Sequence, residues 1–437
     1  MSEASMAPKT VAVLGAGMRG ELFGGILAGL PHLAKVVAVA EPRAAYRERF
    51  AARHGLPESA VYESWQEFAA QPKICDAVVI ATMDRDHLGP AIACLERGYD
   101  LLLEKPMATT IDECAAIARA QTGSGALVAV CHSLRYQKGF RTLKRLLDEG
   151  RIGRVVTIDQ LEQVGFEHYA HSYVRGNWGN AGRATPMLLA KSCHDLDYIA
   201  WLVGAPCARV SSSGELSYFH AGSAPLGAPA RCTDGCPHEL DCPYSALKQY
   251  VQSDRTVWPA SVISPDHSAE AHLEALRTGP YGRCVFHADN DVVDHQVVQL
   301  AFEGGVTATF TMTAFTAQQG RMVRVHGTRG EMLFDEHRMT IVVRDFGAKL
   351  EETIAVEPEP GAHGGGDNRV LRNWLEALHR RDAGLILTDV ATSLMTHAIG
   401  FAAEEARLTG RTVDLAEFKR RHGLDQALEP LPGANML

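Results

Sequence analysis

Two groups of residues in this chain have types and spacings that indicate chemistry, and the first is a glycine-rich turn near the N-terminus. An apolar, β-branched run at residues 10–14 leads into Gly15-Ala16-Gly17-Met18-Arg19-Gly20, and a helical stretch follows. Gly15 permits a tight turn, Gly17 lets the backbone approach a pyrophosphate, and Gly20 lets helix and strand pack closely. Because the first N–H groups of a helix are free, they attract phosphates. The turn, including Met18 and Arg19, is therefore predicted to bind a dinucleotide.

An acidic residue follows the next predicted strand and indicates which dinucleotide is bound. The apolar run at residues 36–40 ends in Glu41. A carboxylate there can accept hydrogen bonds from both hydroxyls of the adenosine ribose and repels a 2′-phosphate, which favours NAD over NADP. Arg43 could instead serve a 2′-phosphate, so NADP is the alternative.

The second group consists of cysteines, three of them within eleven residues: Cys232, Cys236, Cys242 and Cys284. Four thiols suit a tetrahedral Zn²⁺ site, whose bonds would hold together a loop too polar to form its own core. His238 or His287 would replace a cysteine that is not used. Such a site would be structural, because four protein ligands leave no open position. Iron–sulfur ligation and unpaired thiols are the alternatives.

Composition restricts the partners and the compartment. The 437 residues include 43 basic and 52 acidic side chains, a net charge of −9 without any Lys/Arg run, so neither nucleic acid nor an anionic membrane is an expected partner. No apolar stretch approaches the about 18–20 residues of a membrane span, and the first ten residues lack a secretory pattern. We therefore expect a cytoplasmic protein with reduced thiols. The other six cysteines are expected to be small apolar residues of the core: Cys75, Cys94, Cys114, Cys131, Cys193 and Cys207.

Strands and helices alternate through residues 1–130, which predicts an α/β Rossmann domain with a doubly wound parallel sheet. The expected strands are residues 10–14, 36–40, 76–82, 101–103 and 127–130. Ligands of such sheets lie beyond the carboxyl ends of the strands. Four polar residues fall there and are predicted to contact the cofactor: Thr82, His87, Glu104 and Lys105.

Residues 131–437 are predicted to form a second domain, in which several strands alternate as those of a sheet with one covered face should. The expected strands are residues 155–161, 292–302, 306–313, 323–327 and 339–344, and a single helix is expected at 188–203. The segment at about 219–287, which carries the four cysteines, is an insertion relative to the family plan that the resemblance given below implies.

Aromatic and hydrogen-bonding side chains gather in three segments of the second domain, at residues 168–178, 290–295 and 363–367. They suit a polyhydroxylated ligand, because aromatic faces stack on sugars and the polar groups bind hydroxyls. The predicted substrate-binding residues are Arg135, Tyr136, His171, Tyr173, Arg175, Asn177, Trp178, Asp294, His295 and His363.

Taken together, several motifs resemble those of the Gfo/Idh/MocA family. They are GAGMRG, Glu41, DAVVIAT followed by His87, LLLEKP, HSLRY, and His194-x-x-Asp197. The resemblance implies a Rossmann domain, a second α/β domain on a large, open, mostly antiparallel sheet, and a nicotinamide cofactor between them. It implies hydride transfer to or from a secondary alcohol of a sugar or cyclitol, with Lys105 bonding cofactor ribose and substrate before a Pro106 peptide that is often cis. It also implies a homo-oligomer, a dimer or tetramer, formed through the open sheet face.

The chain departs from the family pattern beside the expected catalytic histidine. Family members often carry an acid four residues before it, whereas here that position is Ala190 and Lys191 follows. We predict His194 as the acid/base, with Lys105 and Lys191 polarising the substrate oxygen. Repulsion between the two lysines should lower both pKa values, and Asp195 and Asp197 are expected to cap or pair locally.

The sequence thus predicts an NAD-dependent oxidoreductase that acts on a sugar, a sugar derivative or a cyclitol. One alternative is a glycoside-cleaving enzyme that uses the same cofactor for transient oxidation followed by elimination. A second alternative is a non-catalytic sensor of NAD(H) or a metabolite.

Overall fold

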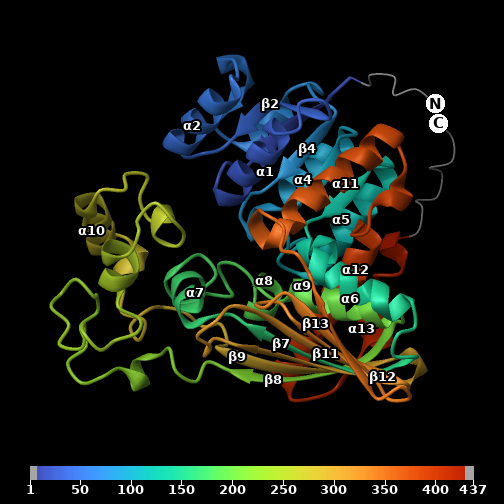
Figure 1. The fold of residues 1–437 in the computed structure, drawn as a ribbon. Coiled ribbons are helices and arrows are strands. Elements are labelled where there is room, and N and C mark those ends of the chain that lie inside the picture. The colour runs from blue at the N-terminus through green and yellow to red at the C-terminus, as the bar shows by residue number, and fades with distance from the viewer. Residues whose placement is uncertain (1–6, 429–437) are drawn as a thin grey trace.

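The first sheet is parallel and carries helices on both faces, as predicted. In the computed structural model, which describes residues 7–428, its six strands run in the order β3-β2-β1-β4-β5-β6 (Figure 1). The strands are β1 (Lys9–Leu14), β2 (Ala34–Ala40), β3 (Val61–Tyr62), β4 (Ala77–Ile80), β5 (Asp100–Leu103) and β6 (Val128–Val130). The helices between them are α1 (Met18–Ala28), α2 (Ala44–His54), α3 (Trp65–Ala70), α4 (Leu88–Glu96) and α5 (Ile111–Ser124).

Alternation along β1 explains why both faces of this sheet are covered. Val11 and Val13 belong to a core that includes Phe23 of α1. Ala12 and Leu14 point into the other core, which includes side chains of α4 and α5. Because successive side chains of a strand point to opposite faces, an unbroken apolar strand requires helices on both sides.

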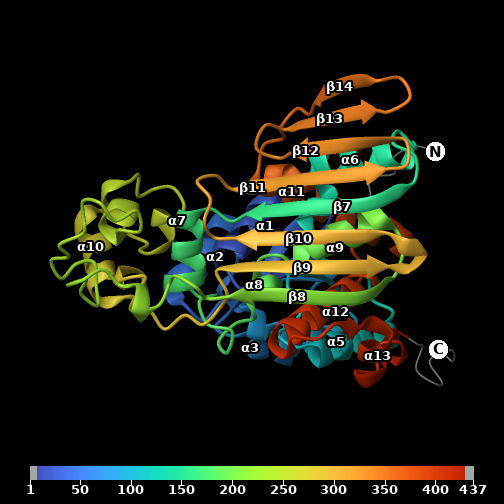
Figure 2. The same cartoon turned by 90° about the horizontal axis from the view of Figure 1, so that it is seen from below.

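The second sheet has nine strands in the order β14-β13-β12-β11-β7-β10-β9-β8-β15. At its centre β7 and β10 pair in parallel, and the other pairs are antiparallel. The strands are β7 (Val155–Gln163), β8 (Cys207–Glu215), β9 (His295–Phe302), β10 (Thr307–Thr313), β11 (Gly320–Gly327), β12 (Gly330–Asp335), β13 (Thr340–Asp345), β14 (Leu350–Ala355) and β15 (Val413–Asp414). Helices cover one face, while the other face is open (Figure 2).

The helices of this part of the chain are α6 (Lys138–Asp148), α7 (Phe166–Tyr169), α8 (Met187–Ala190), α9 (Cys193–Val203), α10 (Ala269–Thr278), α11 (Gly366–Arg380), α12 (Val390–Thr409) and α13 (Leu415–Arg421). The single helix predicted at 188–203 was wrong, because the chain breaks between α8 and α9 at Lys191 and Ser192. The break leaves the Ala190 carbonyl free to accept a hydrogen bond from a side chain of the first domain, as described below.

Helix α11 returns from the second domain and completes the core of the first. Val370, Leu371 and Trp374 are fully buried in the same apolar cluster as Val13 and Phe23. The two sheets are therefore joined by shared packing as well as by the chain connection at β6 (Figure 1).

The predicted insertion is the connection between the antiparallel neighbours β8 and β9. It forms a lobe that contains α10 and projects beyond the end of the sheet near α7 (Figures 1 and 2). The buried cluster within the lobe is small: Ala246, Tyr250, Ala260 and Leu276. Within residues 7–428, no helix has the length and apolar character that crossing a membrane requires.

Candidate functional site

The glycine turn has the geometry that its sequence predicts. Gly15 has φ +90°, and a Cβ there would lie 2.5 Å from the Ala81 carbonyl oxygen. A Cβ on Gly20 would lie 1.8 Å from the Gly15 carbonyl oxygen. Gly17, in contrast, has only the Arg43 guanidinium near its missing side chain, at 3.3 Å. Two glycines are thus required for packing, whereas the third leaves its backbone accessible.

Glu41 lies beside this turn and is already engaged. Its carboxylate accepts hydrogen bonds from the Ala16 N–H at 2.8 Å and from Arg43 Nε at 2.7 Å. Burial acts to raise the pKa of Glu41, but the hydrogen bonds from Arg43 and Ala16 outweigh it, so the pKa is lowered. Glu41 therefore presents a permanent negative charge at the carboxyl end of β2.

Arg19 links the turn to the second domain. Its Nε donates to Glu104 at 2.5 Å, and its two terminal nitrogens donate to Asp367 at 3.0 and 2.8 Å. Asp367, at the start of α11, also accepts from Ser133 Oγ and His363 Nδ1. The Arg19 donors predicted to contact cofactor are thus bound to carboxylates, which raise the pKa of Arg19 against the effect of burial. Met18, by comparison, is exposed at the start of α1.

Lys105 extends from the end of β5 toward the second domain. The Lys105–Pro106 peptide is cis, as the family resemblance implied. The Lys105 Nζ donates to the Ala190 carbonyl oxygen at 2.6 Å, where the helix breaks. His87 is buried and lies 2.7 Å from the Pro106 oxygen, while Thr82 Oγ1 donates to the Asp86 carbonyl. His87 and Thr82 therefore hold the loops around Lys105 in place.

His194, in the first turn of α9, is buried at 4% exposure, and neither ring nitrogen has a hydrogen-bond partner among the described residues. Its ring lies 5.7 Å from that of His132 and 5.8 Å from that of His363. Burial, assisted by the charge of Lys105, holds the pKa of His194 well below its ordinary value. The imidazole is thus neutral near pH 7 and free to accept a proton.

Lys191 has a carboxylate partner that sequence reasoning missed. Its Nζ lies 3.2 Å from Glu162 Oε1, on the covered face of β7. Glu162 Oε2 lies 2.7 Å from Arg321 Nε, which also donates to Asp195 Oδ1 at 2.9 Å. Burial lowers the pKa of Lys191. The charge of Glu162 acts to raise it, while the charges of Arg321 and Lys105 lower it further. The same burial raises the pKa of Glu162 to about 7, against the two cations. We call Lys105, Glu162, Lys191 and His194 the lysine–histidine site.

The two aspartates after His194 form buried ion pairs with arginines far away in the sequence, so the expected local pairing was wrong. Asp195 pairs with Arg321, and Asp197 accepts from Arg135 Nε at 2.6 Å. Arg135 was predicted to bind substrate, but its donors are used by Asp197 and the Leu387 carbonyl. Tyr136 is buried and donates to Asn373 Oδ1 at 2.9 Å.

Some of the other predicted substrate-binding residues lie near the lysine–histidine site. Tyr173 is buried. Burial, together with the charge of Glu162, raises the pKa of the Tyr173 hydroxyl well above its ordinary value. Trp178 Nε1 donates to Asp84, which follows β4, and Asn177 contacts Met83. These contacts join the second domain to the carboxyl edge of the first sheet, where His363 also lies next to His194.

Four predicted residues have their polar atoms engaged elsewhere. His171 Nδ1 meets the Tyr250 hydroxyl at 3.0 Å in the inserted lobe, and Arg175 contacts Cys232. Asp294 accepts from the backbone of residues 217 and 218, and His295 Nδ1 bonds Asp294. These side chains stabilise the junction of the lobe and the sheet.

The four cysteines of the insertion line one pocket, together with His238. Within residues 7–428, however, no three Cys, His, Asp or Glu side chains are arranged to hold a metal ion, so the structure does not support the zinc prediction directly. All ten cysteines are free thiols; five of the six outside the insertion are buried, as expected, and Cys207 is half-buried.

Comparisons with known proteins agree with this architecture. Residues 9–132 match the NAD-binding Rossmann-fold model of the oxidoreductase family GFO_IDH_MocA, and residues 144–415 match the model of its C-terminal alpha/beta domain. The protein YteT of Bacillus subtilis (strain 168) is 25% identical over 313 residues, which make up 68% of this chain and 71% of YteT. The scyllo-inositol 2-dehydrogenase (NADP(+)) IolW of the same strain is 27% identical over 218 residues, 48% of this chain and 58% of its own.

Among solved structures, levoglucosan dehydrogenase in complex with NADH and L-sorbose has a TM-score of 0.69 and 18% identity, covering 94% of this chain and 99% of that chain. At this identity the likeness shows the fold alone. Because the two family models together span both domains, the chain belongs to the Gfo/Idh/MocA family of oxidoreductases.

Proposed function

We propose that the chain is an NAD-dependent dehydrogenase that oxidises a secondary alcohol of a sugar, a sugar derivative or a cyclitol. The observation that carries the proposal is the buried, unpartnered imidazole of His194 near Lys105, at the carboxyl edge of a dinucleotide-binding sheet. The inositol dehydrogenases among the relatives support this class of substrate.

The glycine turn fits a bound dinucleotide. At Gly17 a Cβ would meet the flexible Arg43 guanidinium and no other described group, so a pyrophosphate can approach the backbone there, and α1 has no side-chain cap from the described residues on its first N–H groups. Gly15, Gly17 and Gly20 would hold the pyrophosphate, and Glu41 would accept hydrogen bonds from the adenosine ribose. When bound, NAD⁺ supplies a nicotinamide ring that accepts hydride from the substrate carbon.

NAD is proposed over NADP because the Glu41 carboxylate would repel a 2′-phosphate. The Arg43 guanidinium pairs with Glu41 and lies 3.9 Å from the centroid of the Tyr46 ring. Its positive charge opposes this repulsion. Arg43 is nevertheless committed to Glu41 through three hydrogen bonds, which leaves it less free to bind phosphate.

His194 would take the hydroxyl proton as hydride leaves the carbon. Its lowered pKa keeps the imidazole neutral before the reaction, and its missing hydrogen bonds leave a nitrogen free for the substrate hydroxyl. Lys105 would stabilise the negative charge that develops on the substrate oxygen, because its ammonium lies on the first-domain side of the same site.

Lys191 and Glu162 would serve together as a second proton-handling pair. Their opposed shifts, with the pKa of Lys191 lowered and that of Glu162 raised, bring the two groups closer in acidity than they are in water. Proton transfer between Nζ and the carboxylate, across their 3.2 Å separation, therefore costs less than it would in water. This pair takes the place of the acid that is absent at Ala190.

A homo-oligomer formed through the open sheet face remains part of the proposal. Val297 of β9 is an exposed apolar residue on this face. Its neighbours there include Thr157, Asp159 and Gln299, so the contact would be of mixed polarity.

The proposal is tested with a panel of cyclitols, free sugars and glycosides, incubated with the purified protein and NAD⁺. We expect NADH to accumulate at 340 nm with at least one cyclitol or free sugar. The His194→Gln variant should lose about 10²- to 10⁴-fold in kcat, as expected for a missing general base. His32→Gln, on the exposed surface, is the matched control. Release of aglycone without NADH, or full activity of His194→Gln, would contradict the proposal.

A further inference from the structure

The backbone of the inserted lobe gathers four cysteines that lie far apart in the sequence. An isolated antiparallel bridge pairs Arg231 with Arg283, and Cys232 N–H donates to the Gly282 carbonyl while Cys284 N–H donates to the Ala230 carbonyl. In such a ladder the residues that flank the paired positions lie on one face, so Cys232 and Cys284 are diagonal neighbours. The turn that follows brings up the other two cysteines, because Glu239 N–H bonds to the Cys236 carbonyl and Cys242 N–H to the His238 carbonyl.

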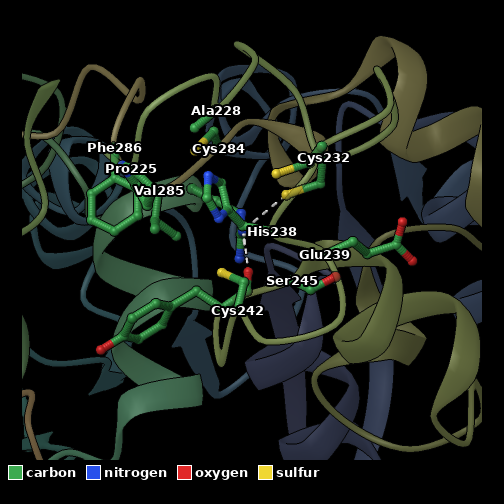
Figure 3. Close-up of a pocket in the computed structure, with 13 residues that line it drawn as sticks. Pro225, Ala228, Cys232, His238, Glu239, Cys242, Ser245, Cys284, Val285 and Phe286 are labelled. Atoms are coloured by element: carbon green, nitrogen blue, oxygen red, sulfur yellow. Dashed lines mark hydrogen bonds between the residues drawn. The ribbon is translucent and has the colours of Figure 1, made fainter. Parts of the chain in front are cut away.

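The four thiols line one small cavity of about 20 Å³. That volume is enough for a single water-sized group and too small for an organic ligand. Figure 3 shows Cys232, Cys242 and Cys284 around this space, with Pro225, Val285 and Phe286 closing one side. Glu239 points away from the three labelled sulfurs in the same view. Sulfur and apolar side chains thus make up most of the lining, and Glu239 is its one carboxylate among the described residues.

Arg175 places a buried positive charge against this cavity. It is 3% exposed, and its donors reach the Arg283 carbonyl at 2.7 Å, the Tyr244 carbonyl at 2.6 Å and Cys232 Sγ at 3.7 Å. In residues 7–428 it forms no ion pair with a carboxylate. The Arg175 guanidinium therefore places a positive charge beside the four thiols, which favours a negatively charged centre at this position.

The lobe also lacks the core that would stabilise it without a crosslink. Four buried residues make up its apolar cluster, and the cysteine-bearing stretch around residues 232–242 is half-buried or exposed. Small units of this kind in other proteins depend on disulfides or on metal ions. The ten cysteines here are free, so a disulfide does not provide the crosslink.

We propose that Cys232, Cys236, Cys242 and Cys284 bind a thiophilic metal centre as thiolates, with Arg175 donating a hydrogen bond to a ligand sulfur. The four thiols do not converge on one point in the present arrangement. A cysteine side chain moves its sulfur by rotation about a single bond, so the four thiols, which line one pocket, can be brought closer by rotamer changes. A metal centre held by four thiolates carries net negative charge, which balances Arg175, and its bonds fasten the turn at 232–242 to the bridge at 284.

His238 and His287 are less suited as ligands than the cysteines. His238 Nε2 donates to the Leu226 carbonyl at 2.9 Å, and His287 Nε2 donates to the Ala228 carbonyl at 3.2 Å. Each imidazole therefore already serves the backbone of the same loop, and the proposal assigns the metal to the four sulfurs.

The experiment measures zinc, iron and acid-labile sulfide in the full-length protein as purified without oxygen. About one zinc ion per chain supports a single-ion site. Iron with an equal amount of sulfide supports a cluster at the same thiols. Neither metal in stoichiometric amount, with four thiols of the native protein freely titratable, would overturn the proposal.

Variants then assign the metal to these residues. Cys232→Ser/Cys242→Ser should lose the metal and lower the Tm, whereas Cys207→Ser, a half-buried cysteine outside the pocket, should retain both. If the double variant does not fold, the wild-type protein gives the answer, because a thiol-specific mercurial should release the metal in proportion to the thiols it modifies. Retention of metal by the double variant, or no release on thiol modification, would refute the assignment.

Discussion

The lysine–histidine site and the four-cysteine pocket both gather reactive side chains from distant segments, but they balance charge in different ways. Around His194, Arg321 faces Asp195 and Glu162, and Lys191 faces Glu162. In the pocket, Arg175 faces carbonyl oxygens and a thiol. The fold thus supplies carboxylates where catalysis is proposed, whereas the pocket leaves charge balance to the state of its thiols.

The two regions also differ in how they are supported. The lysine–histidine site is embedded in the main apolar cluster, which includes Leu189, Leu196 and Ile199 from the helices on either side of the break. The cysteine pocket lies in a lobe whose own apolar cluster has four buried residues, with Tyr244, Val285 and Phe286 joining the edge of the main cluster. A substitution at the lysine–histidine site should therefore lower the reaction rate with little loss of folding stability. A substitution at the cysteine pocket should mainly lower folding stability.

The largest effect expected within this comparison comes from Glu162→Gln. Because the pKa of Glu162 is raised to about 7 by burial, its carboxylate forms as pH rises through that value, and kcat/KM for oxidation should rise with it. The amide cannot exchange a proton with Lys191, so we expect kcat to fall about 10²-fold and the inflection near pH 7 to disappear. The measurement is the pH profile of kcat/KM.

Glu162→Asp is the matched variant, since it keeps a carboxylate at the same position and should restore the pH inflection. An unchanged profile in Glu162→Gln would show that the carboxylate only fills space beside Arg321.

Trp258→Ala tests whether the lobe and the site are independent, and its expected effect is intermediate. Trp258 packs edge-on against His168 at 4.9 Å and against His171 at 5.3 Å. Burial and then the charge of Lys191 lower the pKa of His168, which places this histidine within reach of the site. Each aromatic contact contributes about 0.5–1.5 kcal/mol, so KM should rise up to about tenfold while kcat stays the same. Steady-state kinetics separate the two parameters.

Tyr218→Ala removes another partly exposed aromatic side chain near the lobe. It is the control for a general loss of packing in the lobe. Equal KM changes in Trp258→Ala and in this control would remove the link between lobe and site.

The smallest expected effect is that of Arg43→Ala. Its guanidinium is 54% exposed, and exposed ion pairs contribute about 0–1 kcal/mol, so the Kd for NAD⁺ should change by less than about fivefold. Without the opposing cation, discrimination against NADP⁺ should increase. Titration with both dinucleotides, followed by protein fluorescence, measures the ratio, and a tighter Kd for NADP⁺ would contradict the proposed role of Glu41.

The first domain was predictable because its signals are local. Residues 10–20 specify strand, turn and helix within one short segment, and the glycine positions carry steric requirements that the structure confirms at Gly15 and Gly20. The second sheet was harder to predict. Strand β8 carries three consecutive serines and β14 is mostly exposed, so neither has an apolar alternation. The parallel pairing of β7 with β10 joins segments about 150 residues apart, which no local pattern encodes.

The candidate site also contains some residues that local motifs predict and others that they do not. Lys105 and His194 lie in motifs with a recognisable context, but Glu162 lies on a strand whose alternate residues point into the core. Residues 158, 160 and 162 share one face of the strand by alternation, and Ile158 marks that face as the covered one. A charged residue on that face is the signal that could have identified Glu162. Asp367 and Arg321 were missed because their partners, Arg19 and Asp195, are distant in the sequence.

The return of α11 to the first sheet has a consequence for motion and for dissection of the molecule. A fragment that ends after β6 would lack Trp374 and its neighbours, and would expose the apolar surface that they shield beside Val13 and Phe23. We therefore expect that the dinucleotide-binding domain does not fold stably as an isolated fragment of this kind. Any movement that admits cofactor must keep α11 against the first sheet, because separating them would break the hydrogen bonds between Asp367 and Arg19 and expose the apolar surface around Trp374.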